Sequence, residues 1–117
     1  HGELEPAAEA FPSLDGPARH RVRKRLKRLR YLAEAVGPLH RASAVERFLA
    51  RLGPAQDALG EHMDLELGVA LAVEAAERGE HGAWFNAGWL RAAMPASLRH
   101  CRKALREAAG ARPFWRS

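Results

Sequence analysis

The sequence predicts an all-α protein, a small antiparallel four-helix bundle whose helices are joined by short connections. Two observations favour this fold class. Apolar residues recur at steps of three and four along most of the chain, which is the spacing of one face of an α-helix. No segment keeps the period-two alternation of a half-buried β-strand. With 117 residues, 47% of them hydrophobic, the chain is expected to form one domain around one core.

Residues 1–18 contain three prolines and four acidic residues, and they contain no Lys or Arg. We expect this segment to be an acidic lead-in or linker, and the bundle to comprise residues 19–117. Asp15-Gly16-Pro17 predicts a turn that places a proline at the first position of a helix. Because the chain lacks an initiator Met, we expect it to be a processed or excised piece.

The first helix is predicted from Pro17 to about Val36, where a Gly-Pro pair follows. The second is predicted to begin near Ser43, which stands in capping-box spacing with Glu46. Each helix has one apolar stripe that would face the core. The stripes consist of Val22, Leu26, Leu29, Ala33 and Val36 in the first helix, and of Val45, Phe48, Leu49 and Leu52 in the second.

Gly53-Pro54 is expected to break or kink the second helix and to leave a short continuation after it. A third helix is expected over about residues 63–78, followed by a turn over residues 79–82. The last helical stretch is expected to run from about residue 83 to residue 110, with a bend at Pro95. Connections this short favour antiparallel neighbours.

Charge is the feature that says most about function. The chain has 19 Lys and Arg against 14 Asp and Glu, a net charge of +5. Residues 1–18 carry −4 of this total, so the remainder of the chain carries +9. A domain this basic favours a polyanionic partner, such as nucleic acid, anionic lipid or a phosphate polymer.

The cations are concentrated in residues 19–30, which read RHRVRKRLKRLR. At about 100° per residue, one side of this helix brings six functional side chains within about 120° of its surface. No carboxylate appears before Glu34, whereas an ordinary solvated helix face would contain interspersed Glu. The six side chains on this side of the helix, named here the first basic ladder, are His20, Arg23, Lys24, Lys27, Arg30 and Tyr31. Arg21, Arg25 and Arg28 form a second strip on the other flank of the helix.

Two members of this ladder have alternative interpretations. Tyr31 is placed to hydrogen-bond a phosphate, but a tyrosine beside an apolar stripe is more often half-buried in the core. His20 is placed to donate to a phosphate, or it is a simple surface residue near the start of the helix.

The last helix repeats the pattern on the face opposite Leu98, Cys101 and Leu105. If the bundle brings the two sets of cations together, they would line one groove suited to a linear polyanion. Arg gives bidentate contacts to phosphate oxygens, and Lys gives point charges. This second basic ladder consists of Arg99, Arg102, Lys103 and Arg106.

Other chemistry is weakly represented. A single cysteine, Cys101, excludes an internal disulfide and a CxxC zinc site, and its position predicts a core residue. His62-Met63-Asp64 matches neither HExxH nor an EF-hand loop, so a structural role is expected, with Asp64 capping the third helix or pairing with a basic residue. No glycine-rich phosphate loop and no catalytic dyad is present. The longest purely apolar run, residues 69–73, is far shorter than a membrane span.

The aromatic residues are expected at core-like or terminal positions. They do not alternate with the cations, which counts against base stacking on single-stranded nucleic acid. Trp84, Trp89 and the Phe114-Trp115 pair suit an intermolecular seam as well as an intrachain core. The aromatic residues in question are Phe48, Trp84, Phe85, Trp89, Phe114 and Trp115.

Four segments resemble, in order, the motifs of the CHAD domains, the conserved histidine α-helical domains. The first basic ladder has the spacing of that family's histidine signature, and a later segment is similar to its LQ-x-x-LG-x-x-x-D motif. A stretch containing Gly-Trp and a closing basic-Pro-Phe-Trp sequence follow. Together the four motifs are fairly specific, although each alone would be weak. The segments are His20–Tyr31, Gln56–Asp64, Gly88–Leu90 and Arg112–Trp115.

The resemblance implies an all-helical fold of two four-helix halves around a basic central groove. It also implies binding of inorganic polyphosphate by a cytoplasmic protein, often one associated with polyphosphate granules. This chain resembles the C-terminal half, so either a first half was removed or two copies form a homodimer that rebuilds the groove. The chain departs from the family at Gly53-Pro54, where a Lys is common, so a phosphate contact is expected to be missing there. It also departs at Ala55, where Leu is common, so looser local packing is expected at that position.

Applied to this chain, the resemblance implies phosphate contacts from the first basic ladder, with Arg28 adjacent to it. The second basic ladder is inferred from periodicity, and the family's basic last helix agrees with it. Gln56 and Asp64 are expected to hold the helices together rather than the ligand. The preferred hypothesis is a non-enzymatic polyphosphate-binding module without a cofactor, a metal or a membrane anchor.

Two other classes of function stay open. The same cations would also grip nucleic acid, and competition between polyphosphate and DNA separates these two ligands. An enzyme acting on polyphosphate or a small phosphate ester would need metal-binding carboxylates beside the cations, and the basic helix has none.

Overall fold

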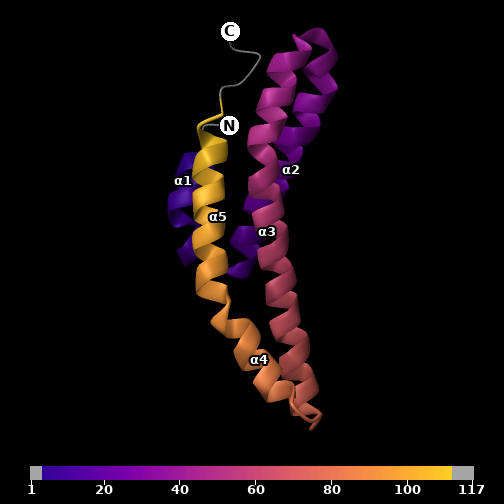
Figure 1. The fold of residues 1–117 in the computed structure, drawn as a ribbon, viewed down its shortest axis with the longest axis vertical. Coiled ribbons are helices and arrows are strands. Elements are labelled where there is room, and N and C mark those ends of the chain that lie inside the picture. Colours follow the sequence, from indigo (N-terminus) through magenta and orange to yellow (C-terminus); the bar gives the residue numbers. More distant parts are fainter. Residues whose placement is uncertain (1–3, 112–117) are drawn as a thin grey trace.

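The computed structural model describes residues 4–111, and over this range it contains helices and short connections without a strand. The predicted all-α fold is therefore confirmed. The molecule is elongated, with extents of 58 × 24 × 20 Å (Figure 1). Its elements are α1 (Leu4–Ala10), the 3-10 helix η1 (Phe11–Ser13), α2 (Gly16–Val36), the 3-10 helix η2 (Gly37–Leu39), α3 (Ala42–Glu77), α4 (Ala83–Ala92) and α5 (Met94–Ala109).

Helix α2 begins and ends as predicted. The side chain of Asp15 accepts a hydrogen bond of 2.8 Å from the Ala18 backbone N–H and caps the helix, and Pro17 occupies the first turn. Val22 and Leu26 of the predicted stripe are buried. The basic helix is thus fixed by one apolar face, and its charged faces remain outside the core.

Helix α3 differs from the prediction. It is 36 residues long and continues through Pro54, where a break or kink was expected. A proline inside a helix costs about 3 kcal/mol. Pro54 itself is exposed, whereas Phe48, Leu52 and Leu59 on either side of it are buried on one face. Burying each of these side chains contributes about 1.5–3 kcal/mol, which outweighs the cost of the proline.

The start of α3 also corrects the sequence analysis. Arg41 is the N-cap residue, and no side chain caps the helix. The predicted capping box of Ser43 and Glu46 is therefore wrong. Val45 instead packs beside Gly37 of η2, where its Cγ1 would lie 3.2 Å from an added Cβ. This close packing, rather than a side-chain cap, defines how the chain enters α3.

The segment expected to be a lead-in contains helix α1, which packs against α5. Leu4, Ala8 and Phe11 are buried in the same cluster as the residues of the longer helices. A seven-residue helix is too short to be stable alone, so this packing is what keeps it folded. The apolar spacing of these three residues was the available signal, and the prolines and acidic residues masked it.

The last helical stretch divides at Ala93 into α4 and α5, and Pro95 lies in the first turn of α5, as the predicted bend requires. The aromatic residues of α4 are not in the core: Trp84 is 60% exposed and Trp89 is 72% exposed. The small residues Ala83 and Ala87 are buried instead. Phe48 is buried as expected, and Phe114 and Trp115 lie outside the described residues.

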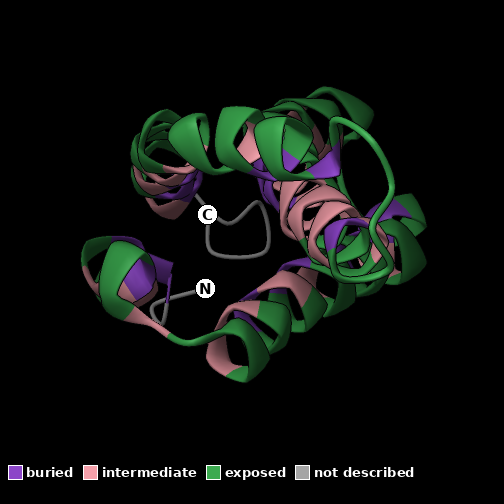
Figure 2. Cartoon of the chain, turned by 90° about the horizontal axis from the view of Figure 1, so that it is seen from below, coloured by how far each residue is buried: buried purple, intermediate pink, exposed green. Residues whose placement is uncertain are grey.

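The helices are arranged around α3 and α5. Helix α3 packs against α2, α4 and α5, and α5 packs against α1. Figure 2 shows the buried residues on the inward sides of the helices and the exposed residues around them. No helix within residues 4–111 is long and apolar enough to cross a membrane.

A buried polar cluster joins α2, α3 and α5. His62 is 1% exposed, and its Nδ1 lies 2.8 Å from Ser97 Oγ of α5. Its Nε2 lies 2.8 Å from Glu66 Oε1, close but outside hydrogen-bond geometry, so Nε2 has no aligned partner within the described residues. Arg19 Nη1 of α2 donates to the same Oε1 at 3.1 Å. The structural role expected for His62 is therefore confirmed.

Arg19 carries the cluster on to η1. Its Nη2 donates to the Pro12 carbonyl at 2.9 Å and its Nε to the Phe11 carbonyl at 3.3 Å. The guanidinium also lies 5.6 Å from the centre of the Phe11 ring, which meets the His62 ring edge-on at 6.3 Å. One side chain of α2 thus closes the connection between α1 and α2.

The continuous helix gives a first prediction. Pro54→Ala should raise the free energy of unfolding by about 1–3 kcal/mol, because alanine restores a backbone N–H within α3 and removes the ring clash. Urea unfolding followed by circular dichroism measures this change. Pro38→Ala is the matched control: Pro38 lies in the first turn of η2, so its replacement should give no gain. An equal gain at both sites would contradict the explanation.

The buried histidine gives a second prediction. Burial lowers the pKa of His62 below its ordinary 6.5, and the opposing effect of Glu66 is smaller. The unfolded chain therefore takes up a proton more readily than the folded chain, so stability should fall as the pH drops below about 6.5. Urea unfolding at pH 7.5, 6.5 and 5.5 measures this slope. His62→Gln does not titrate, and its slope should be smaller; parallel curves for the two proteins would refute the assignment.

Candidate functional site

The first basic ladder lies along the exposed side of α2, and two of its members turn toward α3. Arg30 Nη1 donates to Gln56 Oε1 at 2.9 Å, and its Nε donates to Glu34 at 3.1 Å. Arg23 Nη1 lies 3.5 Å from the Met63 sulfur. The role expected for Gln56, holding the helices together, is confirmed. These contacts fix the rotation of α2 about its axis and so fix which cations face solvent.

Four further side chains on the basic side of α2 remain open to solvent. His20, Lys24, Lys27 and Arg28 are exposed, and none of them has a hydrogen bond or ion pair with the described part of the chain. Like charges this close repel one another, and only a bound anion or counterions relieve that repulsion. The exposed strip therefore favours a polyanion.

Tyr31 lies in the same strip and is 61% exposed. The half-buried core position that its place beside the apolar stripe suggested is therefore wrong. Leu32, its neighbour in the chain, is also exposed at 55%. Tyr31 and Leu32 therefore lie outside the buried apolar stripe of α2, and the Tyr31 side chain is accessible to a ligand.

The second basic ladder has a different environment, because an acidic side chain of α1 occupies its centre. Glu9 receives hydrogen bonds from Arg102 Nη2 at 2.7 Å, from Arg106 Nε at 2.6 Å and from Arg106 Nη2 at 3.0 Å. The Arg106 and Arg102 guanidinium groups lower the pKa of Glu9 to about 2. Arg99 and Lys103 are exposed and have no such partner within residues 4–111.

The two ladders contact different helices. The contacts of the first ladder run to α3, whereas those of the second run to α1. The first ladder is thus largely open to solvent and the second is partly neutralised by Glu9, and one groove lined by both ladders stays a prediction.

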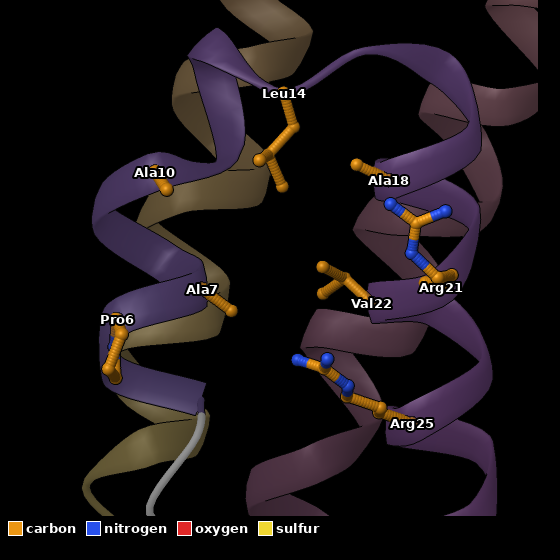
Figure 3. A pocket seen from close by; sticks show the side chains of 8 residues that line it. All are labelled: Pro6, Ala7, Ala10, Leu14, Ala18, Arg21, Val22 and Arg25. Atoms are coloured by element: carbon orange, nitrogen blue, oxygen red, sulfur yellow. The ribbon is translucent and has the colours of Figure 1, made fainter.

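A pocket of about 420 Å³ lies between α1 and α2. Figure 3 shows Ala7 of α1 and Val22 of α2 pointing toward each other across it, and Arg25 extending from α2 toward α1. Arg21 also lines the pocket. Both arginines belong to the second strip of α2, for which the sequence predicted no ligand contact from either of them. Their i, i+4 spacing beside Val22 was the signal for this position.

The remaining candidate residues have structural or unassigned positions. Cys101 is buried, its Sγ donates to the Ala58 carbonyl at 3.3 Å, and burial raises its pKa to about 11, so the predicted core position is confirmed. Asp64 lies exposed inside α3 rather than at the start of a helix, so its predicted capping role is wrong. It has no ion pair with the described residues. Within the same range, no group of three or more His, Cys, Asp or Glu gathers at one point.

Comparison with known proteins identifies the family of this chain. The family model for the CHAD domain matches residues 1–73 of the 117 residues. The matched range contains the first basic ladder and the segment from Gln56 to Asp64, and it excludes the two later motifs. Comparisons with curated proteins and with solved structures give no match. The match covers more than half of the sequence and the whole of the open cationic face of α2, and the chain belongs to the CHAD domain family.

Proposed function

We propose that this chain is a non-enzymatic module that binds inorganic polyphosphate along the first basic ladder of α2. The observation that carries the proposal is the exposed strip of His20, Lys24, Lys27 and Arg28, which has no acidic partner in the described residues. Arg23 and Arg30 border this strip and are held in place by α3. Family membership supports the same ligand.

The mechanism is electrostatic. Each Lys or Arg that contacts a phosphate releases counterions from the polymer, and this release favours binding. From His20 to Arg30 the ladder extends about 15 Å along the helix axis, so it contacts several phosphates of one chain at once. Arg supplies bidentate hydrogen bonds and Lys supplies mobile point charges. Such a module would associate with polyphosphate granules in the cytoplasm, as the family resemblance implies.

The distribution of aromatic side chains favours polyphosphate over single-stranded nucleic acid. Proteins that bind single strands stack bases on aromatic rings beside their cations. Here Trp84, Phe85 and Trp89 lie on α4, whereas the cations of the ladder lie on α2. Tyr31 is the one aromatic residue of the ladder. Binding of duplex DNA does not require base stacking on aromatic side chains, so a competition experiment between duplex DNA and polyphosphate is needed to distinguish these two ligands.

The ladder gives a third prediction. Arg23→Glu/Lys27→Glu should weaken binding of long-chain polyphosphate at least a hundredfold, because it reverses two charges within the strip. Fluorescence titration at near-physiological salt measures the affinity, which should fall steeply as salt is raised. Arg41→Glu/Arg47→Glu is the matched control with the same net charge, and its loss should be much smaller.

The same titration tests the ligand class. Duplex DNA should fail to displace bound polyphosphate, and polyphosphate should displace bound DNA. Equal displacement in both directions would reassign the surface to nucleic acid. Release of orthophosphate in the presence of a divalent metal would contradict the non-enzymatic assignment.

Glu9 gives a fourth prediction. The Glu9 carboxylate accepts the hydrogen bonds of Arg102 and Arg106 that a phosphate group would otherwise accept. Glu9→Gln should therefore free both guanidinium groups and tighten polyphosphate binding about threefold to tenfold. Glu5→Gln is the control, since it makes the same charge change on the same helix away from this contact. If both variants tighten binding equally, the effect is net charge alone and the second ladder takes no part.

A further inference from the structure

We infer that the end of the molecule formed by α4 and the last third of α3 is a seam between two copies of this chain. Figure 1 shows α3 and α4 side by side at this end, without a third helix of the described chain against them. Five large apolar side chains are more than half exposed here. These residues, named the tip surface, are Leu67, Leu71, Trp84, Phe85 and Trp89.

Helix α3 is apolar on every face where it forms this end. Residues 67–73 read LGVALAV, with no polar side chain in two turns of helix. A helix that is apolar all round is expected to be covered all round. Helix α4 covers one side, where Leu90 Cδ1 lies close to Gly68. Leu67 and Leu71 remain 58% and 55% exposed on the rest of the surface.

Helix α4 buries small residues and exposes large aromatic ones, whereas a monomer is expected to bury its large apolar side chains. Its buried residues are Ala83 and Ala87, which have little apolar area to remove from water. Its exposed face carries Trp84, Phe85 and Trp89, and the rings of the last two stack at 6.3 Å between centres. Aromatic side chains provide the most apolar area and dominate interface energetics. Their position on the outside indicates that a second surface covers them.

The exposed area is close to that of a dimer interface. Three aromatic side chains of about 150–250 Å² each and two leucines, all more than half exposed, leave on the order of 600 Å² of apolar surface. This area lies at the upper end of the largest apolar patches of monomers, about 300–600 Å² and often functional, and it is about three quarters of the 800 Å² that a standard interface buries from each partner. If the tip surface of one copy packs against the tip surface of another, the buried apolar area supplies most of the area that a stable interface needs.

A second copy is the occupant that this surface fits. Arg91 is the one charged residue of α4, and Glu74 of α3 shares the helix face of Leu67 and Leu71, so the seam contains few cations and charges of both signs. The same lack of cations does not suit a polyanion or an anionic membrane, both of which need Lys and Arg around the aromatic residues. Two α3–α4 pairs supply four helices, so each copy completes a bundle that the other lacks.

Sedimentation equilibrium of the full chain between 1 and 100 µM tests the seam. The native protein should form a dimer, and Trp89→Glu should weaken the dimer at least tenfold by placing a charge in the seam. Phe85→Glu should act in the same way, and circular dichroism checks that both variants keep their helices. Leu39→Glu is the matched control, because Leu39 is 82% exposed but lies in η2, outside the tip surface.

Three results would overturn the inference. The first is a native chain that is monomeric at 100 µM. The second is a dimer that Leu39→Glu weakens as much as Trp89→Glu does, or that neither tip variant weakens. The third is a monomer that cosediments with neutral or anionic lipid vesicles and loses this binding in Trp89→Glu, which would assign the tip surface to a membrane.

Discussion

The position of the basic helix depends on one carboxylate, that of Glu66. Its Oε1 accepts from Arg19 of α2 and lies beside the buried ring of His62, which contacts Ser97 of α5. Because these groups are largely removed from water, loss of the carboxylate would leave a guanidinium without its partner, at a cost greater than that of a surface ion pair. One turn further along α2, Arg23 contacts Met63 of α3. The Arg19–Glu66 pair at the start of α2 thus fixes how the cationic side of α2 is aligned along α3.

The cations of this chain divide into two groups with different uses. Arg19, Arg30 and Arg106 are paired with carboxylates that belong to other helices or to the next turn, and these pairs orient α1 and α2. Lys24 and Lys27 have no such partner within residues 4–111, and they are among the residues that we propose contact the ligand. A count of charges cannot separate the groups, because Glu66 and Glu9, the partners of Arg19 and Arg106, come from distant parts of the sequence.

Local patterns predicted local features well. The cap at Asp15, the stripe through Val22 and the buried Cys101 follow from spacing and turn chemistry alone. Features that depend on tertiary packing were missed. Pro54 stays inside a helix because buried neighbours on both sides stabilise it, and Trp89 lies outside because Ala87 takes the place against α3. The partial neutralisation of the second basic ladder likewise depends on Glu9 of helix α1, a segment that the sequence presented as a linker.

The unbroken course of α3 has a consequence for assembly. Gln56 and Glu66 of this helix hold the basic helix α2, and Leu67 and Leu71 belong to the tip surface, so the proposed ligand surface and the proposed seam depend on successive lengths of one helix without sharing a residue. A dimer built through the tip therefore keeps both of its cationic strips and has a valence of two. If the proposed ligand and the proposed dimer are both correct, each dimer bridges two polyphosphate chains, and one long chain holds many dimers. Chain length of the polymer would then decide whether the mixture stays dispersed or condenses into a network.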